Sequence, residues 1–144
     1  MIGETLGGKY AIVRLLGEGG MGAVYEARHT GTGRRVAVKV ITGNLARNAK
    51  VASRFEVEAR AAGTIESEHV VAVLDVGHDA TRDVPFIAME YLVGEDVEGL
   101  LSRLGPVAPE AALRIAVQAC FGLEKAHALG IVHRDIKPAN IFLC

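Results

Sequence analysis

The sequence has few cysteines, no long apolar run and almost no net charge. Its only cysteines, Cys120 and Cys144, lie at a spacing that fits no metal site. Cys120 belongs to an apolar helical pattern, so we expect it to be a small buried residue. No run of about eighteen apolar residues occurs, so no segment is expected to span a membrane. The formal net charge of −1 excludes a broad basic field for nucleic acid or an anionic membrane.

Other absences narrow the chemistry. No Gly-Lys-Ser/Thr sequence occurs, which excludes a Walker A loop. The five histidines include no His-Glu-x-x-His or other ligand spacing, so we expect no zinc site. Met1 is followed by Gly3, Glu4 and Lys9 rather than an apolar signal core. The expected compartment is the reducing cytosol, and a membrane anchor in a part beyond Cys144 is left open.

Half of the residues are hydrophobic, which supports a buried core. The N-terminal half reads as strands and turns. A strand is expected over 10–16, and the glycine cluster at 17–24 fits G-x-G-x-x-G-x-V. Glycine permits close approach of backbone N–H groups to phosphate oxygens. A dinucleotide-binding fold uses similar glycines but opens a helix on them. Here 23–28 is strand-like, 29–34 is turn-rich and 36–41 is again a strand, which favours a hairpin over an oxidoreductase or a flexible turn.

Lys39 lies inside the apolar strand 36–41, where an ammonium group needs a partner. Strand alternation places Ala37 and Lys39 on one face and the valines on the other. A helix is expected after a loop within 44–65, ending near Gly63. Two of its glutamates, Glu56 and Glu58, compete as partners of Lys39.

The C-terminal half reads as a strand followed by helices. The strand is expected over 86–92, and helices are expected over 97–104 and 109–128. Asp96 precedes the first helix as a possible cap, Pro109 begins the second, and Gly130 follows its end. The second helix has an expected apolar stripe of Ala112, Ile115, Ala116, Ala119, Leu123 and Ala126.

The segment 133–140 reads His-Arg-Asp-Ile-Lys-Pro-Ala-Asn and contains a carboxylate, a lysine and an amide, the side chains that phosphoryl transfer requires. Asp135 could accept the proton of an attacking hydroxyl, Lys137 could neutralise charge on the moving phosphoryl group, and Asn140 could hold Mg²⁺. Pro138 fixes one φ angle and favours a tight, non-helical turn.

This segment resembles the catalytic loop of protein kinases. Its Lys-Pro-Ala-Asn portion resembles the serine/threonine branch, most closely the bacterial eukaryotic-like enzymes. Val-Ala-Val-Lys at 36–39 resembles the family's V-A-I-K motif, and Phe-Glu-Val-Glu-Ala at 55–59 resembles F-x-x-E-A. The resemblance implies an α+β, protein-kinase-like fold. It has an antiparallel β-sheet N-lobe with one long helix, and the first helices and catalytic loop of a helical C-lobe.

The resemblance also implies a nucleotide cleft that uses ATP and Mg²⁺. Lys39 would bind the α- and β-phosphates and pair with Glu58, and Asp96 would either meet the ribose or cap its helix. The implied catalytic residues are Asp135, Lys137 and Asn140, the last also a metal ligand. The implied nucleotide-binding residues are Leu16, Gly17, Gly19, Gly22, Val24, Ala37, Lys39, Glu58, the back-pocket residue Met89, the adenine-edge residues Glu90 and Leu92, Asp96, and Phe142 under the adenine.

No Asp-Phe-Gly follows Phe142, so the expectation is a truncated kinase domain. It would comprise an N-lobe and hinge over 1–92 and an incomplete C-lobe over 93–144. The expected function is phosphorylation of Ser/Thr hydroxyls of proteins, with little or no activity from these 144 residues alone. The alternative is a catalytically dead nucleotide-binding or partner-binding fragment. The apolar stripe of the helix 109–128 would favour self-association.

Overall fold

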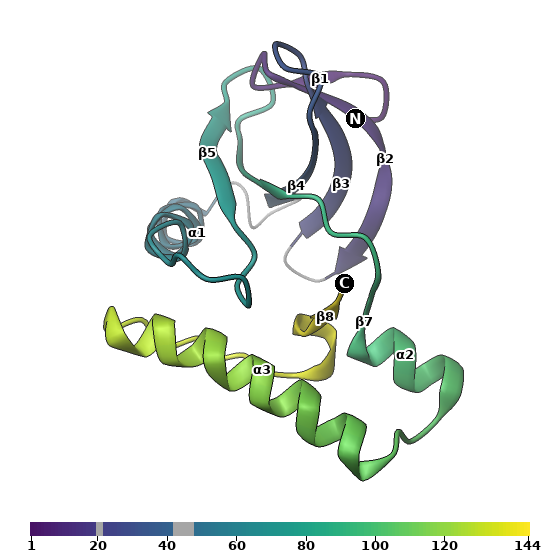
Figure 1. The fold of residues 1–144 in the computed structure, drawn as a ribbon. Coiled ribbons are helices and arrows are strands. Elements are labelled where there is room, and N and C mark those ends of the chain that lie inside the picture. Colours follow the sequence, from purple (N-terminus) through teal and green to yellow (C-terminus); the bar gives the residue numbers. More distant parts are fainter. Residues whose placement is uncertain (20–21, 42–47) are drawn as a thin grey trace. The chain divides into compact units, whose positions relative to one another are not determined.

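The computed structural model describes residues 1–19, 22–41 and 48–144, which divide into two compact units (Figure 1). The first unit comprises Met1–Thr64 and Ala72–Tyr91, and the second comprises Ile65–Val71 and Leu92–Cys144. The expected glycine tip at residues 20–21 and the loop expected from Asn44 lie outside the described residues. The expected boundary after residue 92 stays a prediction, and no sequence pattern indicated that 65–71 belongs to the second unit.

The first unit is built on one antiparallel sheet. Its strand order is β1-β2-β3-β4-β6-β5, so β4 lies between β3 and β6. The strand expected from residue 10 is longer than predicted, and a short strand before it was not predicted. The bounds are β1 Thr5–Leu6, β2 Tyr10–Gly19, β3 Gly22–His29, β4 Arg35–Ile41, β5 Val73–Asp79 and β6 Val84–Glu90.

The apolar face of this sheet forms the core. Val36, Val38 and Val40 of β4 are buried, as alternation predicts, and they pack in a cluster that includes Tyr10 and Phe86. The rings of Tyr10 and Phe86 meet edge to face with their centroids 5.6 Å apart. The core therefore joins the first long strand to β6, two elements far apart in the sequence.

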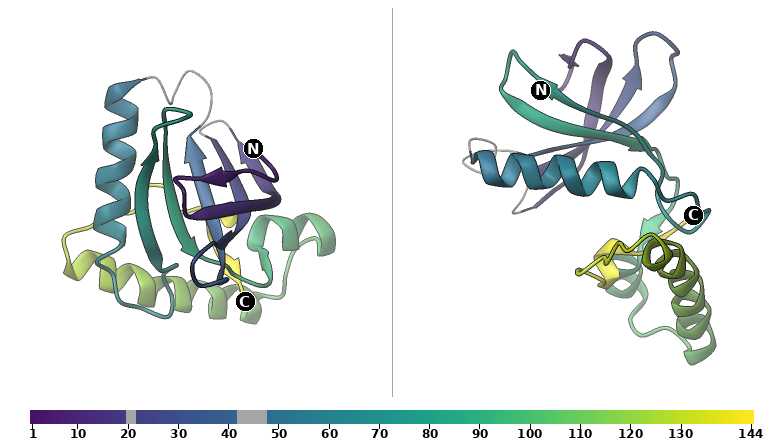
Figure 2. Two further views of the ribbon diagram at one scale, coloured as in Figure 1. Left: turned by 90° about the horizontal axis from the view of Figure 1, so that it is seen from above. Right: turned by 90° about the vertical axis from the view of Figure 1, so that its left-hand side faces the viewer.

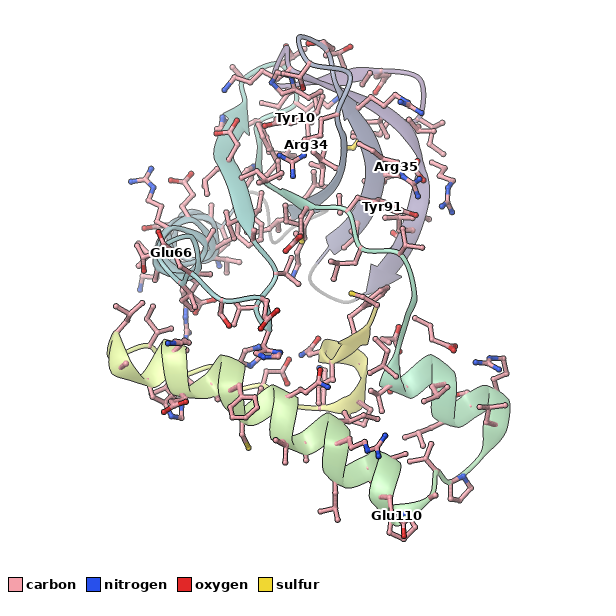
Figure 3. The ribbon with its side chains drawn as sticks, in the orientation of Figure 1. Tyr10, Arg34, Arg35, Glu66, Tyr91 and Glu110 are labelled. Carbon is pink, nitrogen blue, oxygen red and sulfur yellow. The ribbon has the colours of Figure 1, made fainter. Side chains whose placement is uncertain are left out.

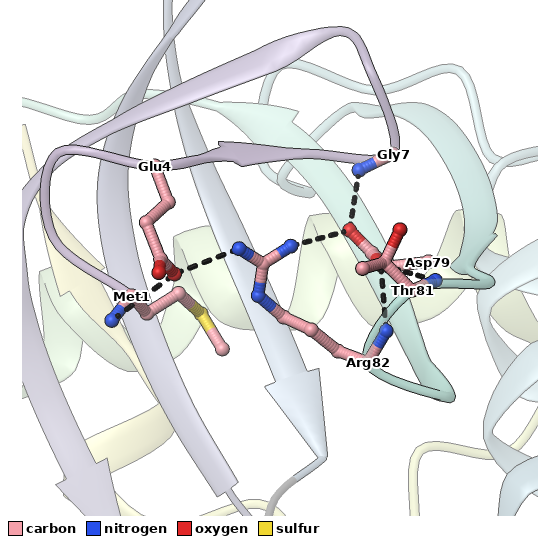
Figure 4. Close-up of polar contacts among 6 residues, drawn as sticks. All are labelled: Met1, Glu4, Gly7, Asp79, Thr81 and Arg82. Carbon is pink, nitrogen blue, oxygen red and sulfur yellow. Dashed lines mark hydrogen bonds and ion pairs between the residues drawn. The ribbon is translucent and has the colours of Figure 1, made fainter.

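Polar contacts fasten the N-terminus to the turn between β5 and β6 (Figure 4). Asp79 is buried, and its Oδ2 accepts hydrogen bonds from the Gly7 backbone N–H at 2.9 Å and from Arg82 Nη1 at 3.0 Å. Arg82 Nη2 also donates to Glu4 Oε2 at 2.8 Å. Burial alone would raise the pKa of Asp79, but the hydrogen bonds from Gly7, Arg82 and Thr81 outweigh it and lower that pKa.

Helix α1, Ala49–Ala62, packs against β5 and β6 (Figure 2). It begins where the Asn48 side chain accepts hydrogen bonds from two backbone N–H groups, and it ends at Gly63 as predicted. Ala59 is buried and Phe55 is half-buried, so these two residues mark the face turned toward the sheet.

The second unit contains helices α2, Val97–Leu104, and α3, Pro109–Ala128, with the bounds that the sequence predicts. Two short strands, β7 Glu95–Asp96 and β8 Phe142–Leu143, pair antiparallel. The turn expected to be non-helical is instead one 3₁₀ turn, Pro138–Asn140, because proline is well suited to the first position of such a turn. Among the described helices, none is long and apolar enough to cross a bilayer.

Helix α3 turns a different face inward from the one predicted. Gly122 is buried against the His69 backbone carbonyl, an approach that any side chain would block. This contact sets the inward face, so Cys120, on the opposite side of the helix, is exposed and its expected burial is wrong. Of the expected stripe, Ala126 is buried, whereas Ala112 and Ala116 are exposed.

The outward face of α3 carries an apolar row spaced four residues apart. Leu113 is 66% exposed, and Val117 and Phe121 are each 50% exposed. Self-association through this helix stays a prediction.

Candidate functional site

The glycine hairpin forms as predicted. Gly19 lies opposite Gly22 and Gly17 lies opposite Val24, so the glycines stand at the end where β2 meets β3. Gly22 has a φ of 154°, and a Cβ there would collide with the Val40 carbonyl oxygen. The chain continues as a strand from Gly22, not as the helix that a dinucleotide-binding fold requires. Leu16, beside a β-bulge in this hairpin, is 39% exposed.

Four of the predicted nucleotide-binding residues share one face of three neighbouring strands. Val24 of β3 lies opposite Lys39 of β4, and Ala37 of β4 lies opposite Met89 of β6. Ala37 is buried, whereas Lys39 is exposed. This face therefore presents an ammonium group beside small and apolar side chains.

The predicted ion pair between Lys39 and Glu58 is absent from the described part of the chain. Glu58 instead pairs with Arg54, one helical turn earlier, at 3.0 Å, and its side chain is 67% exposed. Glu56, which pairs with Arg60, is 33% exposed and lies nearer the inward face. The spacing of three residues from Phe55 therefore does not bring Glu58 inward, as its exposure shows.

The residues predicted for the adenine edge lie where the sheet ends. Glu90 is the last residue of β6; its N–H donates to the Ala72 carbonyl at 3.0 Å, and its Oε1 accepts from the Ala72 N–H at 2.7 Å. Leu92 begins the second unit and is half-buried. Their contacts with a nucleotide stay predictions.

In the second unit, Asp96 caps α2. Its Oδ1 accepts a hydrogen bond from the Gly99 N–H at 2.8 Å, which supports the capping interpretation of this residue. Asp96 also lies opposite Phe142 in the β7–β8 pair. The Val97 N–H donates to the Ile141 carbonyl at 2.8 Å, so the start of α2 is joined to the segment that carries Phe142.

The three predicted catalytic residues come together in the loop before β8. Lys137 Nζ lies 3.0 Å from Asp135 Oδ2, and Asn140 Nδ2 donates to the same oxygen at 2.9 Å. Asn140 Nδ2 also donates to the Asp135 backbone carbonyl at 2.8 Å, and the Asp135 N–H donates to His133 Nδ1 at 3.3 Å. Arg134 adopts a left-handed conformation with a φ of 64°. The loop thus turns one carboxylate toward a lysine and an amide.

These contacts stabilise the carboxylate form of Asp135. Hydrogen bonds from Lys137 and then from Asn140 stabilise its charged form and lower the pKa of this carboxyl below its ordinary value of 3.8. The loop can therefore offer a carboxylate to a hydroxyl proton. Within the described ranges, no three His, Cys, Asp or Glu side chains gather where they could hold a metal ion.

A polar cluster that no sequence pattern indicated lies on the sheet face that carries Ala37. Glu26 pairs with Arg14 and Arg35 from the flanking strands, and both arginines contact Tyr91 at the end of the first unit. Figure 3 shows Arg35 and Tyr91 together. The opposite charges of Arg14 and Glu26 could have indicated this cluster. They do so only if the register that pairs β2 with β3 is known.

Comparisons with known proteins agree on one family. Residues 10–144 match the family model described as the protein kinase domain. The serine/threonine-protein kinase Pkn1 of Myxococcus xanthus is 44% identical over 94% of this chain, and PknH of Mycobacterium tuberculosis is 41% identical over 94%. The chain spans only 19% and 21% of those two relatives.

Solved structures show the same fold. The kinase domain of Mycobacterium tuberculosis PknI matches with a TM-score of 0.85 at 33% identity, covering 99% of this chain and 57% of that one. Rad53, solved in complex with AMP-PNP, matches with a TM-score of 0.77 at 26% identity, covering 92% of this chain and 34% of that one. The kinase-like α+β fold that the sequence predicts is confirmed.

Proposed function

Because the chain belongs to the protein kinase family, we propose that its residues serve the transfer of the γ-phosphoryl group of ATP to Ser or Thr hydroxyls of proteins. The observation that carries the proposal is the position of the Asp135 carboxylate, whose Oδ2 lies 3.0 Å from Lys137 Nζ and accepts a hydrogen bond from Asn140 Nδ2 at 2.9 Å. A base of this kind must be charged before the substrate arrives, and these contacts favour that state.

In the proposed step the substrate hydroxyl oxygen bonds to the γ-phosphorus while the bond to the departing ADP oxygen breaks. Asp135 takes the hydroxyl proton, and Lys137 neutralises charge on the phosphoryl oxygens. Mg²⁺, when bound, would neutralise further phosphate charge. Asn140 suits this ion, because its Nδ2 is used toward Asp135 while its carbonyl oxygen is the kind of donor that Mg²⁺ prefers.

The first unit would supply most of the nucleotide contacts. Backbone N–H groups of the glycine hairpin suit phosphate oxygens, and Lys39 suits the α- and β-phosphates. The adenine would use the backbone at Glu90 and Leu92, with Met89 behind it. Phe142 and Asp96 would contribute from the second unit. The AMP-PNP complex of Rad53 supports a nucleotide as ligand. Convergence of the two groups in one cleft belongs to this proposal.

A second candidate function is nucleotide or partner binding without catalysis. The 144 residues contain no Asp-Phe-Gly motif, whose aspartate holds the principal Mg²⁺ in the family. We therefore expect these 144 residues alone to bind ATP but to transfer little or no phosphate. The proposed location is the cytoplasm, which suits two exposed free cysteines, and the proposed partners are ATP and proteins with accessible Ser or Thr.

Two measurements on the 144-residue chain test these proposals. Titration calorimetry with ATP and Mg²⁺ should show binding, and Lys39→Met should weaken it about tenfold because a charged phosphate contact is lost. Lys50→Met, which removes an exposed lysine on α1, is the matched control. Absence of ATP binding by the unaltered chain would contradict the nucleotide site.

Transfer of ³²P from ATP to a generic basic protein separates the two candidate functions. Little or no transfer is expected from the 144 residues, with or without Asp135→Ala. Clear transfer that Asp135→Ala abolishes would instead show that these residues catalyse the reaction unaided and would exclude the non-catalytic alternative.

A further inference from the structure

Three side chains on the sheet face, those of Arg14, Glu26 and Arg35, form a connected set of contacts with Tyr91, the last residue of the first unit. We propose that Arg14, Glu26 and Arg35 act through Tyr91 as positioning residues that hold the backbone at 90–92 for the adenine edge of ATP. The inference rests on the proposed nucleotide site, and none of the four residues is assigned a contact with the nucleotide itself.

Glu26 is the centre of this cluster. Its side chain is only 10% exposed, and each carboxylate oxygen takes one arginine: Arg14 Nε lies 2.8 Å from Oε2, and Arg35 Nε lies 3.1 Å from Oε1. A buried carboxylate is stable only when its oxygens are satisfied, and here two cations from the flanking strands satisfy them. Glu26 therefore fixes the positions of both guanidinium groups.

Both arginines then reach Tyr91. Arg14 Nη2 donates to the Tyr91 hydroxyl at 3.1 Å, and the Arg35 guanidinium carbon lies 3.6 Å from the centre of the Tyr91 ring. Figure 3 shows Arg35 beside this ring. The Tyr91 ring face is thus held from β4 and its hydroxyl from β2. The contacts run from Glu26 through both arginines to Tyr91, and we call this closed set of four residues the circuit.

The sheet register explains why the circuit closes. A β-bulge between Ile12 and Arg14 brings Arg14 opposite Glu26. Val36 lies opposite Glu90, so the next antiparallel position along β4 brings Arg35 to Tyr91. Glu26 is also the cross-strand neighbour of Ala37.

The circuit therefore lies on the sheet face proposed for the nucleotide. Its arginines contact Tyr91, the first residue after Glu90, which forms the last pair between β6 and β4. The end of a strand opens more readily than its middle, because fewer hydrogen bonds hold it. A backbone that opens at 91 cannot keep the N–H and C=O groups of 90–92 in place for adenine. The side-chain contacts of Tyr91 replace the ladder bonds that the chain lacks there.

The test combines hydrogen exchange with a pair of ligands. Arg35→Met keeps much of the apolar stem but removes the charge, and Tyr91→Leu removes the ring and hydroxyl. Both should speed exchange of the neighbouring Glu90 amide, whose N–H donates to the Ala72 carbonyl, about tenfold, and Tyr91→Phe, which keeps the ring, should have a smaller effect. Arg34→Met, at the neighbouring exposed position, is the matched control.

In calorimetry, Arg35→Met and Tyr91→Leu should each weaken the binding of ATP about three- to tenfold. Inorganic tripolyphosphate, which has no adenine, should bind all variants equally. Unchanged exchange of the Glu90 amide, unchanged ATP affinity, or equal weakening of the binding of both ligands would overturn the inference. If the unaltered chain binds no ATP, the proposed nucleotide site fails and this inference fails with it.

Discussion

The two units hold their functional residues in different ways. In the first unit, contacts join residues far apart in the chain, such as the Gly7 N–H and Asp79, which are 72 positions apart. In the second unit, the side chains of the proposed catalytic loop contact residues within five positions of one another, as Asn140 and Asp135 show. These side-chain contacts are therefore local, whereas the sheet face depends on the whole first unit being folded.

The two units also differ in how many side chains they bury. The first unit has a core of fully buried valines and aromatic rings, but the helices of the second unit bury few side chains, and α3 leaves Phe121 half exposed. Long-range packing gives the first unit a cooperative core, so a change there should affect every element of its sheet. Changes on the outer face of α3 should have little effect on stability.

The largest test of this contrast compares two phenylalanines. Phe86 is 2% exposed and Phe121 is 50% exposed. Phe86→Ala should lower the free energy of unfolding by about 3–5 kcal/mol, because it leaves a cavity in the core. Phe121→Ala should lower it by about 1 kcal/mol or less. Urea denaturation of both variants makes the comparison, and equal midpoints would remove the distinction between the units.

The next test concerns the fastening of the N-terminus. Asp79→Asn should lower the free energy of unfolding by about 2 kcal/mol at pH 7, because a buried charge-assisted set of hydrogen bonds is weakened. Asp83→Asn, in the same turn but 84% exposed, is the matched control and should have a much smaller effect.

The Asp79 effect should depend on pH. The folded-state pKa of Asp79 is lowered below the ordinary value of 3.8, which the unfolded chain retains. Its stabilisation is therefore fully present above about pH 4 and is lost as the pH falls through the folded-state pKa. Urea midpoints of wild type and Asp79→Asn should converge in acid. A difference that stays constant from pH 7 to the acid limit would contradict this assignment.

The sequence predicted most elements because their signals are local. Pro109 and Gly130 bracket α3, and alternation around Val38 gave the two faces of β4 correctly. The sequence also placed Asp135, Lys137 and Asn140 in one short segment, and the structure brings them together; their catalytic roles stay predictions. Contacts within one short segment can be predicted without knowing how the helices and strands pack.

What the sequence could not show depends on register and rotation. The bulge before Arg14 shifts the pairing of β2 by one residue, and no alternation pattern reveals it. The rotation of α1 decides whether Glu58 faces the sheet, and the pairing with Arg54 accompanies an outward position. For Cys120, the decisive feature was the approach of Gly122 to the His69 backbone, a contact between segments distant in sequence.

The smallest expected effect lies in the catalytic loop. Lys137→Met should raise the pKa of Asp135 toward its ordinary value of 3.8, because the first of the contacts that lower it is removed. Carboxyl ¹³C resonances followed through an acid titration measure this directly, with Lys125→Met on α3 as the control. The urea midpoint should hardly change, since both partners are about half exposed. A large loss of stability would mean that the loop is not locally held.

Gly7 and Gly77, which lie against the Phe86 ring, limit which residues the sequence can accept at these positions. A side chain at Gly7 or at Gly77 would meet the Phe86 ring at less than van der Waals distance, so the ring fills the space between two backbones. A side chain at Gly77 is then tolerable only if a smaller residue replaces Phe86, so among relatives these two sites should vary together. Gly7 should stay glycine in either case, because its φ of 55° strains any side chain.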